Sequence, residues 1–204
     1  MNYKLLILGH KRMGKDTMAE FLNKEFGISF SSSSRAATEL FIFNKLKDRF
    51  NYKNINECFN DRFNYRDIWY QLICEYNKYD KTRLAKEVLK TSDIYVGMRD
   101  WDEVVACKKE NLFDLIIWVD ASERLPLEDS SSFTIDKCLA DVIIDNNGSE
   151  EEFKQRVINF GKLIFKKQNK FFENSRSLTL EESGYSATGR KYGVSDNAIR
   201  KWIK

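Results

Sequence analysis

The residues with the clearest chemistry lie near the N-terminus, in the run Gly9-His10-Lys11-Arg12-Met13-Gly14-Lys15-Asp16-Thr17. This run fits the pattern G-x-x-x-x-G-K, in which the glycines let the backbone curl until successive N–H groups point inward at a phosphate. A short apolar run, residues 3–8, precedes it, and a helical pattern, residues 15–26, follows it. We therefore predict a loop that binds the phosphates of ATP, called the phosphate loop below, with contacts from Gly9, Lys11, Arg12, Met13, Gly14, Lys15, Asp16 and Thr17.

Lys15 is the predicted catalytic cation of this loop, because its ammonium would follow the charge that builds on the β- and γ-phosphates during transfer. Asp16 stands where the pattern usually has Ser or Thr, and a carboxylate beside a triphosphate is favourable only if Mg²⁺ lies between them. Asp16 and Thr17 are therefore the predicted magnesium ligands. Alternatively, Asp16 is a first-turn acid that favours the helix dipole, which is compatible with binding the metal.

The composition of the 204-residue chain is that of a folded protein, with 42% hydrophobic residues and a net charge of +3. The sequence has no apolar run long enough to span a membrane, and the N-terminus lacks the features of a secretory signal. Four scattered cysteines and a single histidine do not form a zinc set, so we read the cysteines as reduced thiols of a cytoplasmic protein.

Strand-like and helix-like segments alternate along the chain, which is typical of an α/β fold with a parallel sheet. We expect strands at residues 3–8, 28–30, 93–96, 115–119 and 142–144. Helices are expected at residues 15–26, at 102–109 and after Ser149, with an inserted helical region over about residues 35–90. The helix after Ser149 would bury the stripe formed by Phe153, Val157, Phe160 and Ile164.

Three segments together resemble the bacteriophage deoxynucleoside monophosphate kinases, a branch of the P-loop nucleoside monophosphate kinases. They are the phosphate loop with its G-x-x-x-x-G-K-D-T pattern, residues 94–99 followed by Glu103, and the pair of segments 118–126 and 141–148. The resemblance covers roughly residues 1–165. It implies a three-layer α/β/α P-loop kinase fold over residues 1–167, with ATP and Mg²⁺ as donor and cofactor. The acceptor, a deoxynucleoside monophosphate, would bind in the helical region and leave as the diphosphate.

Arginines would hold the phosphates in such a kinase. Arg99 follows a strand expected beside the loop strand, where it could clamp the acceptor phosphate or the transferring group, so it is predicted as both catalytic and substrate-binding. Arg35 and Arg66 begin helices of the inserted region and are predicted to grip the monophosphate. Arg124, which follows the strand at residues 115–119, is predicted to approach ATP from a short lid. Arg35, Arg66 and Arg99 could instead form structural ion pairs.

The end of the chain differs in composition from the rest. Residues 168–182 are polar and are predicted to be a linker, and residues 183–204 resemble a helix-turn-helix, a small all-α tail. Such a tail could contact DNA through the major groove. The alternative is a docking or oligomerisation element, which would allow a homodimer.

Two other functions are compatible with the same residues. In the first, the chain is a DNA-binding or regulatory protein whose kinase fold only senses nucleotide. In the second, the chain is a P-loop kinase that acts on another phosphorylated acceptor, such as a polynucleotide 5′ end or a non-nucleotide phosphate. Base recognition would lie in the helical region, whose pattern does not distinguish these acceptors.

Overall fold

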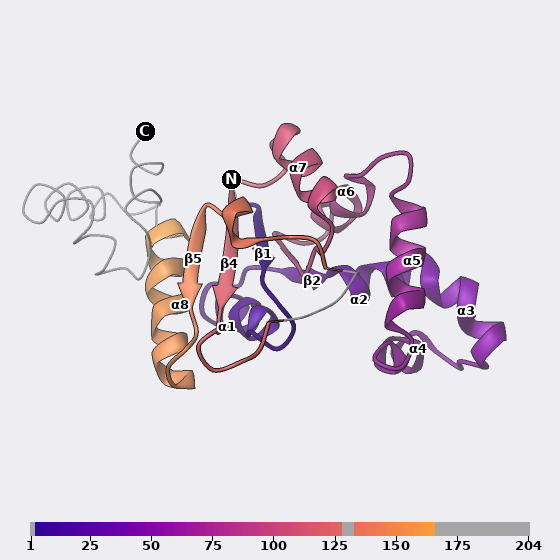
Figure 1. Ribbon diagram of the computed structural model, residues 1–204, viewed down its shortest axis with the longest axis horizontal. Coiled ribbons are helices and arrows are strands. Elements are labelled where there is room, and N and C mark those ends of the chain that lie inside the picture. The colour runs from indigo at the N-terminus through magenta and orange to yellow at the C-terminus, as the bar shows by residue number, and fades with distance from the viewer. Residues whose placement is uncertain (1–2, 128–132, 166–204) are drawn as a thin grey trace, which may run out of the picture.

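The computed structural model describes residues 3–127 and 133–165 (Figure 1). The predicted linker at residues 168–182 and the predicted helix-turn-helix at residues 183–204 lie outside the described residues, so both stay predictions. No helix among the described residues is long and apolar enough to cross a membrane.

A five-stranded, all-parallel sheet forms the centre of the molecule. Its strands are β1 (Leu5–Leu8), β2 (Phe30–Ser32), β3 (Ile94–Val96), β4 (Leu115–Asp120) and β5 (Val142–Asp145). They lie in the order β2-β3-β1-β4-β5, and every neighbouring pair is parallel. The strand that leads into the phosphate loop is therefore central, flanked by β3 and β4.

The two faces of the sheet are covered by different helices, which gives three layers. Alternate side chains point to opposite faces, so Leu5 and Ile7 of β1 join one core while Leu6 and Leu8 join the other. The first core is closed by α1 (Lys15–Phe26) and α8 (Glu150–Phe165). The second is closed by α2 (Ser33–Ala37), α6 (Arg83–Leu89) and α7 (Trp101–Lys109). The predicted α/β/α architecture with a parallel sheet is confirmed.

An entirely helical stretch separates β2 from β3. After α2 come a π-helical turn, Thr38–Ile42, and then α3 (Phe43–Phe50), α4 (Ile55–Asp61), α5 (Arg66–Tyr76) and α6. Figure 1 shows α3, α4 and α5 beyond the β2 edge of the sheet. Leu46 and Trp69 of this stretch are buried in the same core as Leu6 and Tyr95 of the sheet. The helical region therefore packs as an extension of the second core.

Several local expectations can be compared directly with the structure. The four apolar residues expected on one stripe of α8 are all buried, and Ser149 and Glu152 bond to each other's backbone N–H groups at its start. The second strand is the exception, since it spans Phe30–Ser32 instead of residues 28–30. Ser31 and Ser32 fit there because β2 is an edge strand with half-buried side chains, and Ser32 then caps α2.

Candidate functional site

The phosphate loop is a tight bend between β1 and α1 in which two glycines are structurally required. Gly9 has φ 140°, and a Cβ there would lie 2.6 Å from the carbonyl oxygen of Val119. Gly14 has φ 94°, and a Cβ there would lie 2.5 Å from Nδ2 of Asn146. Arg12 also has a positive φ, 65°. Any side chain at the two glycines would push the loop away from the strands behind it.

Lys15 lies across this bend. Its Nζ donates to the carbonyl oxygen of His10 at 2.6 Å, and Lys15 lines the cavity described below. The helix that it begins has no side-chain hydrogen bond at its N-cap, Gly14. The N–H groups of the first turn of α1 therefore keep their capacity to donate to an anion, and the ammonium lies next to them.

The other side chains of the phosphate loop divide into three kinds. Lys11, Arg12 and Asp16 are exposed and line the cavity. The His10 ring packs on Phe133, with 4.3 Å between centroids. Met13 is fully buried, so it can offer a phosphate only its backbone.

A cavity of about 680 Å³ starts at the phosphate loop and runs between the ends of β2 and β3 and the helices α4, α5 and α7. Its walls combine cations with aromatic rings. The cations are Lys11, Arg12, Lys15, Arg62, Arg66 and Arg99. The aromatic residues are Phe59, Phe63, Trp69, Tyr70 and Tyr95. This combination suits a ligand that carries both a phosphate and a flat apolar ring.

Arg62 is the most enclosed of the helical-region cations in the cavity. Its guanidinium lies over Phe59, 3.7 Å from the centroid, and over Phe63 at 4.1 Å, and it donates to the Phe59 carbonyl oxygen at 2.8 Å. Burial lowers its pKa, the nearby Asp16 raises it, and Arg66 lowers it further. The neighbouring guanidinium of Arg66 and the burial both make an anion favourable at this point of the cavity.

Of the arginines predicted to bind the acceptor, Arg66 and Arg99 line the cavity and Arg35 does not. Arg99 lies over the Phe133 ring, 5.5 Å from its centroid, and comes three residues after the end of β3, the strand beside β1. Arg35 instead bonds Glu39 at 2.5 Å and Asn56 at 2.8 Å. Arg35 thus forms an ion pair with Glu39, and its guanidinium also lies over the ring of Phe59, 5.3 Å from the centroid.

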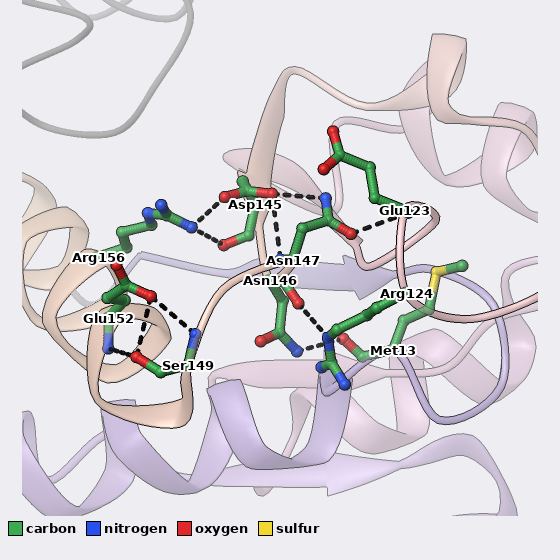
Figure 2. Close-up of polar contacts among 9 residues, drawn as sticks. All are labelled: Met13, Glu123, Arg124, Asp145, Asn146, Asn147, Ser149, Glu152 and Arg156. Carbon is green, nitrogen blue, oxygen red and sulfur yellow. Dashed lines mark hydrogen bonds and ion pairs between the residues drawn. The ribbon is translucent and has the colours of Figure 1, made fainter.

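Figure 2 shows how the chain after β5 is tied to the phosphate loop. The Asn146 side chain donates to the Met13 carbonyl oxygen at 2.9 Å, and the Asn146 carbonyl oxygen accepts from Nε of Arg124 at 2.6 Å. Asn147 links the same segment to Glu123, and Asp145 forms an ion pair with Arg156 of α8. Arg124 is therefore fixed beside the phosphate loop, and it is not among the described residues that line the cavity.

At the α7 side of the cavity lies a buried carboxylate. Glu103 is 4% exposed and accepts a hydrogen bond from Nδ2 of Asn77 at 2.8 Å. Burial raises the pKa of Glu103 to about 7, with the Asn77 bond acting in the opposite direction. Its neighbours in the cavity wall include Tyr70, Cys74 and Tyr95.

The described residues contain no group of three or more His, Cys, Asp or Glu side chains that could hold a metal ion. Magnesium does not need such a group, because it is commonly bound by one or two protein oxygens together with substrate phosphates. Asp16 fits that role, since it is exposed in the cavity one residue after Lys15. Thr17 is half-buried and is not among the described residues that line the cavity.

Reasoning from sequence missed three residues of this site: Arg62, Asn146 and Glu103. Arg62 ends a helix whose orientation the sequence does not show, although its position between Phe59 and Phe63 was a usable signal. Asn146 looked like part of a turn, because its contact with Met13 spans 133 positions of the chain. Glu103 was noticed only as part of a motif, and its burial depends on α5 packing against α7.

The solved structures to which this chain is similar include an unliganded sugar kinase from Janibacter sp. HTCC2649. It is 13% identical, covers 78% of this chain and 93% of its own length, and has a TM-score of 0.38. No protein-family model and no curated protein matches the chain. The function therefore has to be argued from the site itself.

Proposed function

We propose that this protein is a phosphotransferase that uses Mg·ATP to phosphorylate a deoxynucleoside 5′-monophosphate. One observation carries the proposal: a single cavity joins the phosphate loop to a group of arginines and an aromatic wall. A phosphate loop alone would fit any ATP-binding protein. The second, cation-lined space beside it favours a second anionic substrate, placed where a phosphoryl group bound at Lys15 could reach it.

The residues divide the work between donor and acceptor. The loop amides, Lys11, Arg12 and Lys15 would hold the ATP phosphates, with Asp16 holding Mg²⁺. When bound, the metal would supply positive charge that neutralises part of the charge on the transferring phosphates. Arg62, Arg66 and Arg99 would bind the acceptor phosphate, whose oxygen is already anionic at neutral pH. No general base is then required, and catalysis consists of alignment and charge stabilisation.

The aromatic wall favours a nucleotide acceptor over a sugar phosphate. Phe59, Phe63 and Tyr70 present flat rings or ring edges to the cavity, and bases stack on such surfaces. That the sugar is a deoxyribose rests on the sequence resemblance, which also places ATP as the donor. Arg124 would approach ATP from the side of Met13 and Asn146.

An acceptor panel tests this proposal. The full chain is given Mg·ATP with each deoxynucleoside and ribonucleoside monophosphate, a sugar phosphate and a 5′-phosphorylated oligonucleotide, and ADP formation is followed. We expect turnover with at least one deoxynucleoside monophosphate. Turnover only with the sugar phosphate or the oligonucleotide would replace the acceptor class, and nucleotide binding without turnover with any acceptor would favour the sensing alternative.

The role of Lys15 can be tested by Lys15→Ala. Removing the cation that meets the developing charge should lower kcat at least about a hundredfold while thermal unfolding stays unchanged. Lys24→Ala is the matched control, because Lys24 is exposed at the far end of the same helix. Near-normal turnover of Lys15→Ala would contradict the assignment of the phosphate loop.

A further inference from the structure

Glu103 is the one acidic side chain of the cavity wall that is deeply buried. The other two, Asp16 and Asp100, are exposed and half-buried, and Asp100 already accepts the Glu103 backbone N–H as the N-cap of α7. A glutamate at this position of a helix often turns back to bond the backbone of the cap residue. Here the side chain instead turns inward, to Asn77, the C-cap residue of α5.

The hydrogen-bonding capacity of Glu103 is only partly used. A carboxylate can accept about four hydrogen bonds, and among the described residues its side chain receives one, from Asn77. Asn77 is itself 1% exposed and is fixed by accepting the backbone N–H of Leu84 at 3.1 Å. The carboxylate is therefore held rigidly, with acceptor capacity left in a cavity of about 680 Å³.

The charged surroundings do not neutralise Glu103. Lys81, a cation that interacts with Glu103, lies 3.6 Å from Asp100 and so is shared with a second acid. The titratable side chains that interact with Glu103 are Asp100, Lys81, Tyr70, Cys74, Tyr95 and Cys107. A buried carboxylate with one hydrogen bond is costly unless a ligand completes its bonding.

We propose that Glu103 selects the acceptor by accepting N–H groups from the edge of its base, and that this edge is that of guanine. The inference rests on the proposed function and names the base that the same cavity takes. Guanine carries two adjacent donors, N1–H and the N2 amino group, which match the two oxygens of one carboxylate. Adenine and cytosine place a ring-nitrogen lone pair beside their amino group, and thymine flanks its single N–H with two carbonyls, so each turns at least one acceptor toward Glu103.

The arrangement of the cavity agrees with this assignment. Glu103 lies in the first turn of α7, four residues after Arg99, and both line the same cavity, so a phosphate at Arg99 and a base at Glu103 can belong to one ligand. Tyr70 of α5 lines the same cavity, and along the chain it lies between Arg66 and Asn77. Phosphate, ring and base edge thus have separate partners in a single cavity.

Glu103→Gln tests the proposal, with Asp102→Asn as the matched control on an exposed neighbour of the same helix. For each protein, kcat/KM and calorimetric Kd are measured for dGMP and dAMP. In wild type dGMP should be preferred. In Glu103→Gln the dGMP-to-dAMP ratio should fall at least about tenfold, because an amide can donate to adenine N1 and accept from its amino group. Asp102→Asn should leave the ratio unchanged.

A second readout separates base recognition from a merely structural role. As the pH falls through about 7, Glu103 takes up a proton, so the dGMP-to-dAMP ratio of the wild type should fall. That pH dependence should disappear in Glu103→Gln. An unchanged ratio in the variant, in turnover or in binding, would overturn the role of Glu103, whereas a chain that phosphorylates no monophosphate would overturn the proposed function instead.

Discussion

At the scale of single residues, Arg62 is the side chain most dependent on its surroundings. Its guanidinium is stacked between Phe59 and Phe63 and lies near both Asp16 and Arg66. Asp16 is therefore positioned to balance the arginines until phosphates arrive. This placement joins the proposed magnesium side of the site to the proposed acceptor side.

Replacing Arg62 by Gln should weaken acceptor binding. A charge-assisted bond to phosphate contributes about 1.5–3 kcal/mol, so the KM for the monophosphate should rise about tenfold or more, with a smaller change in the KM for ATP. Steady-state kinetics with each substrate varied in turn measures this. Arg49→Gln is the control, since Arg49 also lies over a phenylalanine, Phe50, but outside the cavity. Equal effects of the two substitutions would contradict the role of Arg62.

Glu103 should also affect stability in a pH-dependent way. Because its pKa is raised from 4.5 to about 7 in the folded protein, the folded state binds the proton more tightly than the unfolded chain does. The stability that Glu103 contributes is therefore complete below about pH 4.5 and is lost as the pH rises through 7.

Glu103→Gln, which removes this titration, should accordingly raise the free energy of unfolding relative to wild type at pH 8, by roughly 1–3 kcal/mol. Near pH 5 the difference should be small, because Glu103 is then mostly protonated. Urea unfolding at the two pH values measures it. A difference of the same size at both would show that ionisation of Glu103 is not its cause.

The sequence identified the functional residues whose roles depend on their close neighbours in the chain, and it missed those whose roles depend on tertiary packing. Lys15 and Asp16 belong to a contiguous motif whose spacing identifies a phosphate-binding loop. Arg66 begins a helix and Arg99 comes shortly after a strand. Arg35 began a helix in the same way, yet its side chain bonds Glu39 one turn later. The direction of a side chain around a helix of the inserted region is decided by packing, which no local pattern reports.

At the scale of elements, the phosphate loop depends on the segment that packs behind it. Asn146 supports the loop by donating to Met13, and this requires the absence of a side chain at Gly14. The segment after β5 thereby ties the phosphate loop to the strand at the edge of the sheet (Figure 2).

Gly14→Ala should therefore destabilise the loop by more than the cost of placing alanine at a positive φ. Alanine at a positive φ costs about 1–2 kcal/mol, and here its Cβ would also displace Asn146. Gly27→Ala is the matched control, because Gly27 also has a positive φ, 69°, but a Cβ there meets nothing within 4 Å. We expect both variants to lose stability in urea unfolding and only Gly14→Ala to lose ATP affinity in calorimetry. Equal ATP affinity in the two would contradict the supporting role of Asn146.

The positions of helices and strands along the chain were more predictable than which elements pack against each other. The helix at residues 15–26 and the strands near residues 94, 115 and 142 follow from apolar periodicity, since both faces of a parallel strand are buried. The second strand was placed too early, because the serines that favour a turn in isolation also suit an edge strand.

At the scale of the whole molecule, the cavity exists because the helical region shares its core with the sheet. Trp69 and Leu46 pack in the same cluster as Leu6 and Tyr95, so the helical region is held against the sheet. The order of strands and the packing of this region join residues 9, 62, 66, 99 and 103, which lie far apart in the chain. That assembly is a tertiary property, and the sequence indicated only its separate parts.

The most direct test of the central claim follows the phosphoryl group itself. The full chain is incubated with Mg²⁺, dGMP and ATP that carries a radiolabel on its γ-phosphate, and the products are separated. We predict that the label appears in the β-phosphate of dGDP with wild-type protein and fails to appear there with Lys15→Ala. Label found only in inorganic phosphate, or retained in ATP in the presence of every deoxynucleoside monophosphate, would contradict the account.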